Sequence, residues 1–209
     1  MISYRIAKSS DSLTIAKVHM KCAESQKGGF FHKLGLTFLT EYYKIELSNK
    51  YSFVLIAENE SGICQGFHSG TFKAEEHFKA LKNNRIRLAI SLIPQFVYKP
   101  KLLIEVMKRY ISITKKSEKY NFGIKEGPRG EYWGWLPKSP NPIESLNLHK
   151  KWHLIFKQLG ANFVKSEVDI TNDRVYKSIK IMGAEILSEI ILPDGRKRAI
   201  VQYDLSKFK

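Results

Sequence analysis

The sequence predicts a fold of the α/β (α+β) class, in which strands and helices share one core. Two observations lead to this prediction. Strand-like segments rich in apolar residues occur in both halves of the chain, for example residues 53–57 and 163–170. Other segments carry apolar residues at every third or fourth position, which is the spacing of an amphipathic helix. With 209 residues, 43% of them apolar, the chain is long enough to bury a large core, so we expect a single domain.

The composition narrows the class of protein. The two cysteines, Cys22 and Cys64, are too few for a disulfide framework, which favours a cytoplasmic location. The first residues contain no apolar signal segment. The longest apolar run, residues 88–98, is too short to span a bilayer and contains Pro94, so we predict no transmembrane segment.

The first third of the chain predicts a strand, two helices and a hairpin. The helices are indicated by capping residues before the first and by a Gly28-Gly29 break before the second, and the hairpin by a polar turn at residues 58–62. The predicted elements are a strand (3–7), a helix after the caps at 9–12, a helix (32–47) and the hairpin strands (53–57 and 63–70).

Residues 71–120 form a basic segment. They contain twelve Lys or Arg residues and four Glu residues, and Pro94 and Pro100 divide them into two or three helices. We interpret the segment as an insertion packed over one mouth of the sheet, where it would contribute to the choice of ligand. A basic surface could also serve nucleic acid or anionic lipid. No nucleic-acid-binding motif is present, so we expect no nucleic-acid partner, although nucleic-acid binding stays open as an alternative.

The second half predicts alternating strands and helices, followed by a hairpin. Glycines at 160 and 183 end the two helices, and Pro193-Asp194-Gly195 is a strong turn sequence. The predicted elements are a strand (131–136), a helix (144–159), a strand (163–170), a helix after the caps at 171–173, and the hairpin strands (185–192 and 197–205).

One stretch of the second half carries a family pattern. It reads Asp169-Ile170-Thr171-Asn172-Asp173-Arg174-Val175, and Gly183 follows eleven positions after Asn172. This stretch resembles the late strand–helix segment of the GCN5-related N-acetyltransferase (GNAT) superfamily. The phrase with Leu34-Gly35, Phe38-Leu39 and Tyr42-Tyr43 resembles the second helix of that family. The resemblance covers residues 1–70 and 131–205.

The resemblance implies a GNAT-like mixed, mostly antiparallel sheet with helices on both faces and a helical insertion at 71–120. It also implies that the strands around Trp133 and Phe163 diverge near Trp135 and Ile170, leaving a slot for a long thiol-bearing cofactor. The implied activity is transfer of an acetyl group from acetyl-CoA to a primary amine of a small-molecule acceptor. An amino sugar, free or nucleotide-linked, would suit the basic insertion, and a homodimer is compatible with the resemblance.

The same resemblance implies which residues bind acetyl-CoA. Its diphosphate would lie at the loop and helix start of residues 137–145, where backbone N–H groups and the helix dipole favour anions. A backbone N–H at the end of the preceding strand would polarise the thioester carbonyl. The residues assigned to the cofactor are Trp135, Leu136, Pro137, Lys138, Ser145, Asn172, Tyr176, Lys177 and Lys180.

The sequence departs from the family pattern at two places. Pro140, Ile143 and Ser145 stand where the family's phosphate loop has Gln or Arg, Gly, and Gly or Ala. Ile179 stands where the family often has a tyrosine that protonates the leaving thiolate. A second interpretation therefore stays open, in which the chain is a non-catalytic binding module on the same fold.

Four residues are candidates for catalysis: Glu131, Tyr132, His149 and Asn172. Glu131, Tyr132 and His149 carry groups that could accept a proton from the amine, and Asn172 belongs to the family pattern. His149 and His153 have the i, i+4 spacing of two zinc ligands, but the sequence offers no third ligand of matching type nearby. We therefore predict no metal site.

Overall fold

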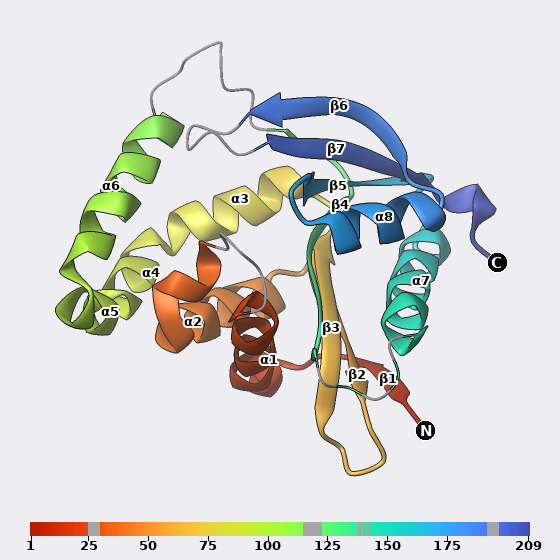
Figure 1. Cartoon of the computed structure of the whole chain (residues 1–209), viewed down its shortest axis with the longest axis horizontal. Helices are drawn as coiled ribbons and strands as arrows, with labels where there is room; N and C mark the ends of the chain where they lie inside the picture. The colour runs from red at the N-terminus through yellow and green to blue at the C-terminus, as the bar shows by residue number, and fades with distance from the viewer. Residues whose placement is uncertain (25–29, 115–122, 138, 140, 142, 192–196) are drawn as a thin grey trace.

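The computed structural model describes residues 1–24, 30–114, 123–137, 139, 141, 143–191 and 197–209. Its strands form one seven-stranded sheet in the order β1-β2-β3-β4-β5-β7-β6 (Figure 1). Every neighbouring pair is antiparallel except β4 and β5, which are parallel. The strands are β1 (Ser3–Ile6), β2 (Ser52–Glu58), β3 (Cys64–Thr71), β4 (Arg129–Trp135), β5 (Phe163–Asp169), β6 (Glu185–Ile191) and β7 (Lys197–Asp204). The expected fold class, a mostly antiparallel mixed sheet with helices, is confirmed.

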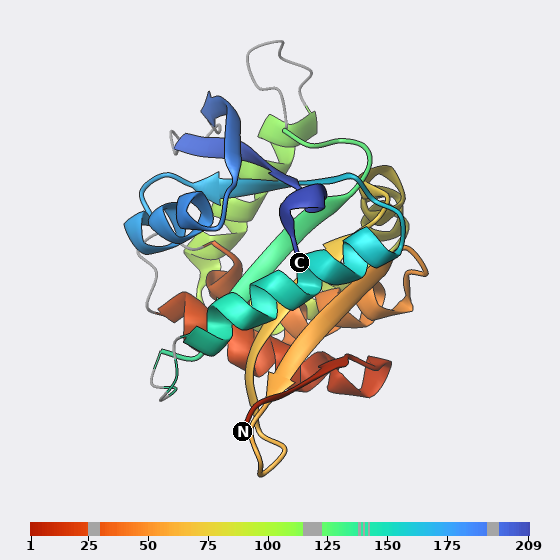
Figure 2. The ribbon, with the colours of Figure 1, turned by 90° about the vertical axis from the view of Figure 1, so that its right-hand side faces the viewer.

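Helices cover both faces of the β1–β4 half of the sheet. Successive residues of a strand point to opposite faces, and β2 shows this clearly. Val54 and Ile56 pack with α1 (Ser12–Glu24) and α2 (Gly35–Ser48) on one face. Phe53 and Leu55 pack with α7 (Ile143–Gln158) on the other face, which α7 crosses obliquely in Figure 2. Because β2 is apolar on both faces, it lies in the interior of the molecule.

The insertion contains four helices in the described part of the chain, more than the two or three predicted. The extra break falls at Asn84, whose side chain donates to the Ala80 carbonyl oxygen at 2.9 Å and ends a helix without proline. Pro94 and Pro100 stand in the first turn of the helices that follow, where proline is well tolerated. The helices are α3 (Ala74–Asn83), α4 (Arg85–Ser91), α5 (Ile93–Tyr98) and α6 (Pro100–Thr114).

The sequence suggested an insertion over one mouth of the sheet; in the structure much of the insertion packs beside α2, and α3 reaches the start of β4, where His77 lies 3.7 Å from Glu131. A Cβ added at Gly35, the first residue of α2, would overlap the side chain of Gln95 in α5. Lys33 in the short helix η2 (Phe31–Leu34) binds Glu105 of α6 at 3.2 Å. The insertion is therefore tied to η2 and the start of α2 (Figure 1).

The second half of the sheet is built from the late strand–helix unit and the C-terminal hairpin. The helix α8 (Asp173–Ile181) follows β5, and Gly183 ends the unit with a φ of 83°. The strand β7 returns between β5 and β6. The predicted turn at Pro193-Asp194-Gly195 lies outside the described residues. Among the helices that the structure describes, none combines the length and the apolar character needed to cross a bilayer.

Candidate active site

The parallel strands β4 and β5 form a split in the middle of the sheet. They pair only through Arg129 with Lys165 and Gly130 with Ser166. Beyond these pairs β4 continues along β3, whereas β5 continues along β7 (Figure 1). The sequence placed the divergence near Trp135 and Ile170, but it begins earlier, directly after the Gly130–Ser166 pair. The split is therefore longer than expected.

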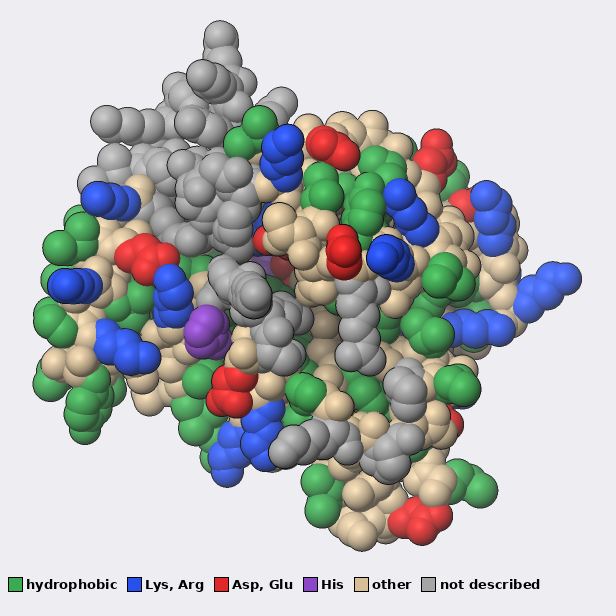
Figure 3. Space-filling view, viewed as in Figure 1, with side chains coloured by type: hydrophobic (Ala, Val, Ile, Leu, Met, Phe, Trp, Pro, Cys, Tyr) green, Lys and Arg blue, Asp and Glu red, His purple; other side chains and the backbone are tan. Residues whose placement is uncertain are grey.

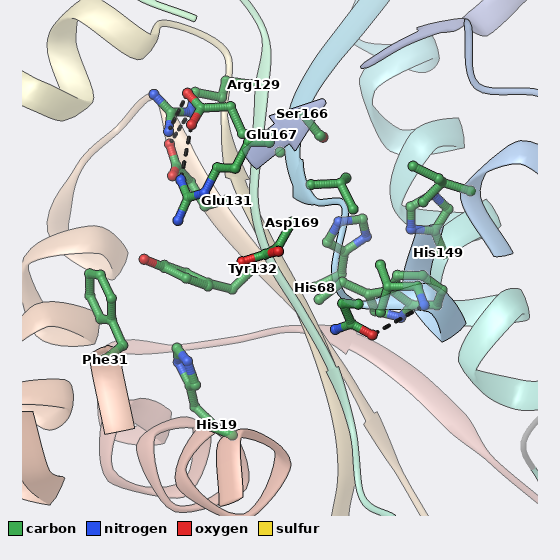
Figure 4. Close-up of a pocket in the computed structure, with 18 of the residues that line it drawn as sticks. His19, Phe31, His68, Arg129, Glu131, Tyr132, His149, Ser166, Glu167 and Asp169 are labelled. Atoms are coloured by element: carbon green, nitrogen blue, oxygen red, sulfur yellow. Dashed lines mark hydrogen bonds and ion pairs between the residues drawn. The ribbon is translucent and has the colours of Figure 1, made fainter. Parts of the chain in front are cut away.

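A cavity of about 620 Å³ occupies the split. It has one wall from α1, η2 and β4, which includes His19, Phe31 and Tyr132 (Figure 4). The opposite wall includes His149 of α7 and Tyr203 of β7. The residues at the start of α8 that line it are Asn172, Asp173 and Val175. The cavity thus joins elements that cover opposite faces of the sheet.

The centre of the first wall is aromatic. The ring of Tyr132 lies 5.1 Å from that of Phe31 and 4.8 Å from that of His19, measured between centroids. His19 Nδ1 lies 2.8 Å from the hydroxyl of Tyr43, and burial lowers the pKa of His19 to about 4. Neither His19 nor Phe31 was predicted to belong to the site.

A buried network of charges stands at one end of this wall. Arg129 Nε lies 3.1 Å from Glu131 Oε1, and Arg129 Nη2 lies 3.5 Å from Glu167 Oε1. Glu167 also binds Arg198 at 3.0 Å. Figure 4 shows Glu131 and Glu167 turned toward Arg129. Burial raises the pKa of Glu131 to about 7, against the opposing effect of Arg129. Glu131 can therefore exchange a proton near neutral pH.

A second layer of polar side chains lies behind Glu131, away from the cavity. His77 of α3 has Nε2 at 3.7 Å from Glu131 Oε1 and at 3.5 Å from the hydroxyl of Tyr42. Glu46 of α2 is 1% exposed, and the side chains of Ser69 and Tyr42 lie next to its carboxyl group. Burial, and then the charge of Glu131, raise the pKa of Glu46 well above its usual range. The insertion thus supplies one residue, His77, that touches a predicted catalytic group.

The opposite wall contains stacked histidines. The rings of His68 and His149 lie 4.7 Å apart and nearly parallel, and Trp133 lies 4.5 Å from His149. Both ring nitrogens of His149 lack a hydrogen-bond partner in the part of the chain that the structure describes. Burial holds the pKa of His149 well below its usual range, so the ring is neutral. The Tyr203 hydroxyl also has no partner among the described residues.

The backbone of β4 presents N–H groups to the split. Leu136 donates its N–H to the Gln65 carbonyl oxygen at 2.9 Å, which engages it with β3. Successive N–H groups of a strand point to opposite edges. The N–H groups of Trp133 and Trp135 therefore point away from β3 and toward the split. Of the two N–H groups predicted to polarise a carbonyl, only that of Trp135 has the required direction.

The residues predicted to bind the cofactor lie in two places. At the start of α7, Pro137 is exposed, Ser145 is half-buried, and Lys138 lies outside the described residues. On α8, Asn172 accepts the N–H of Val175 at 3.4 Å as a helix cap. Further along α8, Lys177 lies 3.9 Å from Asp173, and Lys180 stands 4.5 Å over the ring of Tyr176.

The four predicted catalytic residues all line the cavity, whereas most of the predicted cofactor residues do not. Glu131 and Tyr132 lie on the aromatic wall, His149 on the opposite wall, and Asn172 at the start of α8. Among the cofactor residues that the structure describes, only Asn172 lines the cavity; Tyr176, Lys177 and Lys180 face elsewhere on α8. Within the described ranges, no group of three His, Cys, Asp or Glu side chains is arranged to hold a metal ion.

Comparisons with known proteins give a likeness in structure but not in sequence. No family model matches the chain, and no curated protein matches it. An N-acetyltransferase from Staphylococcus aureus Mu50 superposes with a TM-score of 0.60 at 11% identity, covering 98% of this chain and 99% of that one. The yncA protein of Salmonella typhimurium, assigned as an acetyltransferase and solved with its cofactor acetyl-CoA, gives 0.58 at 9% identity and covers 98% and 94%. The spermidine/spermine N-acetyltransferase SpeG of Vibrio cholerae gives 0.55 at 10% identity and covers 100% and 97%.

Proposed function

The chain has the fold of the GCN5-related N-acetyltransferases, and from this premise we propose that it transfers an acetyl group from acetyl-CoA to a primary amine of a small molecule. The observation that carries the proposal is the cavity in the split between β4 and β5, which joins elements on opposite faces of the sheet. A transferase of this kind needs such a passage, because donor and acceptor must meet while each is held from its own side.

The side of the split formed by the end of β4 and the N-terminus of α7, which we call the donor side, fits a thioester cofactor. When bound, acetyl-CoA supplies the acetyl group. The N–H groups of Trp133 and Trp135 point into the split, where they can hydrogen-bond to a carbonyl oxygen. The N-terminus of α7, with Ser145 in its first turn, is the place that we assign to the diphosphate, together with Pro137 and Lys138. Pro140 and Ile143 replace residues of the usual glycine-rich loop, so side chains and the helix end must provide more of this contact.

The acceptor side suits a cationic amine. Arg129 and Arg198 line the cavity beside a larger number of carboxylates, four in all, so in a chain with a net charge of +15 the site is more negative than the protein as a whole. The carboxylates are Glu131, Glu167, Asp169 and Asp173. The rings of Phe31 and Tyr132 offer faces on which an ammonium group binds favourably. An amino sugar, free or nucleotide-linked, remains our proposal for the acceptor because the insertion beside η2 is basic.

The reaction needs two proton transfers, and we assign one side chain to each of them. The amine must lose a proton before it attacks, and Glu131, with a pKa of about 7, can accept it. The leaving thiolate must gain a proton, and Ile179, at the usual tyrosine position, cannot supply one. Tyr203 lines the cavity, and its buried hydroxyl has no partner among the described residues, so we assign this role to it. The sequence alone gave no sign of Tyr203, because it sits in an ordinary strand pattern.

The test is release of the CoA thiol in the presence of a panel of amines that includes polyamines, amino sugars and nucleotide-linked amino sugars. We expect amine-dependent release from at least one class, and loss of most of it in Tyr203→Phe. Calorimetry with acetyl-CoA separates the alternatives. Binding without turnover of any amine would favour the non-catalytic binding module, and absence of binding at millimolar acetyl-CoA would remove the proposal altogether.

A further inference from the structure

The helices α4 and α5 have two apolar faces, and only one is used for packing. Leu92 is the single residue between the two helices, and its backbone is helical, with φ of −86° and ψ of −16°. The inward face carries Leu88, Leu92 and Phe96, which pack with the core of α1 and α2. The outward face carries Ile86, Ile90, Ile93 and Val97.

The outward residues form one stripe along the surface. Their spacing of i, i+4, i+7 and i+11 places them on the same side of a nearly continuous helix. Ile86 is 69% exposed and Val97 is 75% exposed, so the stripe is open to solvent. The next residue, Tyr98, is 81% exposed. Because the core already has its own apolar residues on these helices, the stripe is not needed for folding.

The helix α6 repeats this arrangement beside α5. Leu102 is buried, whereas Leu103, Ile104 and Met107 are exposed. Figure 3 shows hydrophobic side chains along its left-hand edge, over α5 and α6, with Lys and Arg side chains among them. We name the exposed apolar residues of α4, α5 and α6, together with Tyr98, the insertion face.

The charges around the insertion face are mostly positive. Residues 85–108 contain five Lys or Arg residues and one Glu. The Glu is Glu105, which is bound by Lys33 at 3.2 Å, and one of the cations, Arg87, is paired with Glu41 of α2. The cationic residues are Arg85, Arg87, Lys99, Lys101 and Lys108, all exposed. A partner for this face must therefore be apolar at its centre and anionic around it.

We propose that the insertion face docks the protein on an anionic lipid surface. Helices with an apolar stripe flanked by Lys and Arg lie in the headgroup region of such membranes, with the stripe among the acyl chains. Lysine side chains can bury their stems and keep their charge in the headgroup layer, and an exposed tyrosine is typical of that layer. A second copy of this chain fits less well, because a symmetric contact would place basic residues against basic residues. Nucleic acid would leave the apolar stripe uncovered.

The docked orientation would place the membrane beside the aromatic wall of the cavity. The ion pair of Lys33 with Glu105 joins α6 to η2, and η2 also carries Phe31 of the cavity wall. An acceptor at the lipid surface would then have a short path to the split. The docking itself does not depend on the proposed acetyl transfer, because it uses residues outside the cavity.

Co-sedimentation with vesicles tests the proposal. We expect the protein to bind vesicles of phosphatidylcholine mixed with phosphatidylglycerol, to bind pure phosphatidylcholine much less, and to lose binding as salt rises. The double variant Ile93→Asp/Val97→Asp should bind anionic vesicles ~10-fold more weakly or worse. Lys99→Ala/Lys101→Ala should lose about 5-fold for each lysine. All of the changed side chains are exposed, and circular dichroism should show wild-type folding.

The matched control is Ile63→Asp, an equally drastic change at a residue that is 59% exposed in the turn between β2 and β3. It should bind vesicles like the wild type. The proposal is overturned if the wild type ignores anionic vesicles at low salt, if it binds neutral vesicles equally well, or if the control loses as much as the double variant. A dimer that Val97→Asp dissociates, in a protein that does not bind vesicles, would assign the face to a second copy instead.

Discussion

Glu131 combines two properties that a general base needs, contact with the cavity and a pKa near neutrality. The carboxyl is buried, which favours its neutral form, while Arg129 at 3.1 Å keeps the ionised form accessible. Its neighbour Tyr132 lies on the same wall, but burial raises the pKa of that hydroxyl so far that it remains protonated. Glu131 is therefore the better proton acceptor of the two.

We predict that Glu131→Gln lowers kcat by ~10²-fold or more and removes the acidic limb of the pH profile. The base must be ionised to act, so wild-type activity should rise with pH through a midpoint of about 7. The measurement is CoA-thiol release against pH with an amine that the wild type acetylates. Glu46→Gln is the control, because this buried carboxyl does not line the cavity. A Glu131→Gln variant with an unchanged pH profile would show that the base is elsewhere.

A second prediction concerns His149 and the pH dependence of the free energy of unfolding. Its pKa is lowered in the folded state, so below the ordinary histidine pKa of about 6.5 the unfolded chain takes up a proton that the folded chain does not. Stability should therefore fall as pH drops below this value, by up to about 1.4 kcal/mol per pH unit for this residue. In His149→Leu the slope should be smaller by that amount, measured by urea unfolding from neutral pH to about pH 5.

His153→Leu is the matched comparison for His149→Leu. Burial lowers the pKa of His153 to about 4, so its slope should change in the same direction. However, His153 Nδ1 lies 2.8 Å from the His149 carbonyl oxygen, and losing this contact should lower stability at neutral pH by about 1 kcal/mol. Identical slopes in the wild type and in both variants would mean that these rings titrate normally in the folded protein.

At the residue level, the sequence predicted side chains whose position follows from a strand pattern, and missed those brought in by tertiary contacts. Glu131 and Tyr132 were recognisable because they begin a strand in a known unit. His19 and Phe31 reach the cavity only because α1 and η2 pack against β4, and periodicity carries no information about that contact. The sequence gave no role to Glu167, whose place in the site follows from its ion pairs with Arg129 and Arg198.

At the level of secondary structure, the pairing of β4 with β5 requires the backbone at Gly130 to lie close to Ser166. A Cβ added at Gly130 would overlap Ser166 Oγ, at one of the two positions where these strands pair. We predict that Gly130→Ala destabilises the protein by about 1–3 kcal/mol, because the added methyl group must displace the Ser166 hydroxyl or move the two strands apart. Adding Ser166→Ala removes the overlapping oxygen and should recover most of the loss. Thermal or urea unfolding of the two single variants and the double variant measures this; additive effects would contradict a shared contact.

The elements themselves were largely predictable, and the exceptions have local causes. Apolar periodicity and glycine stops predicted the strands and helices of the two halves well. In the insertion the sequence suggested that prolines would set the helix boundaries, but Asn84 also ends a helix by bonding to its own preceding turn. Asparagine has too many alternative roles for this break to be inferred from sequence. The stripe on α4 and α5 was visible as apolar residues, but its exposure was not.

For the molecule as a whole, the split follows from the order of the strands. Two antiparallel units meet through a single parallel pair, and each unit follows its own twist once that pair ends. The sequence predicted both hairpins, yet the return of β7 between β5 and β6 depends on long-range pairing that no short window contains. The family resemblance, and not the local pattern, supplied the expectation of a split.

The last prediction tests whether the split is the donor site. A ligand that binds only the folded state stabilises it by about 2.7 kcal/mol at a concentration 100 times its Kd, which for a chain of this size raises Tm by ~5–10 °C. Acetyl-CoA should produce such a shift in the wild type. Val175 lines the cavity at the start of α8, so Val175→Trp should fill the split and abolish the shift. Ile181→Trp adds the same ring at a residue of α8 that is 82% exposed, and it should leave the shift intact. If Val175→Trp folds normally and still gains stability from acetyl-CoA, the cofactor binds elsewhere and the cavity between β4 and β5 has another occupant.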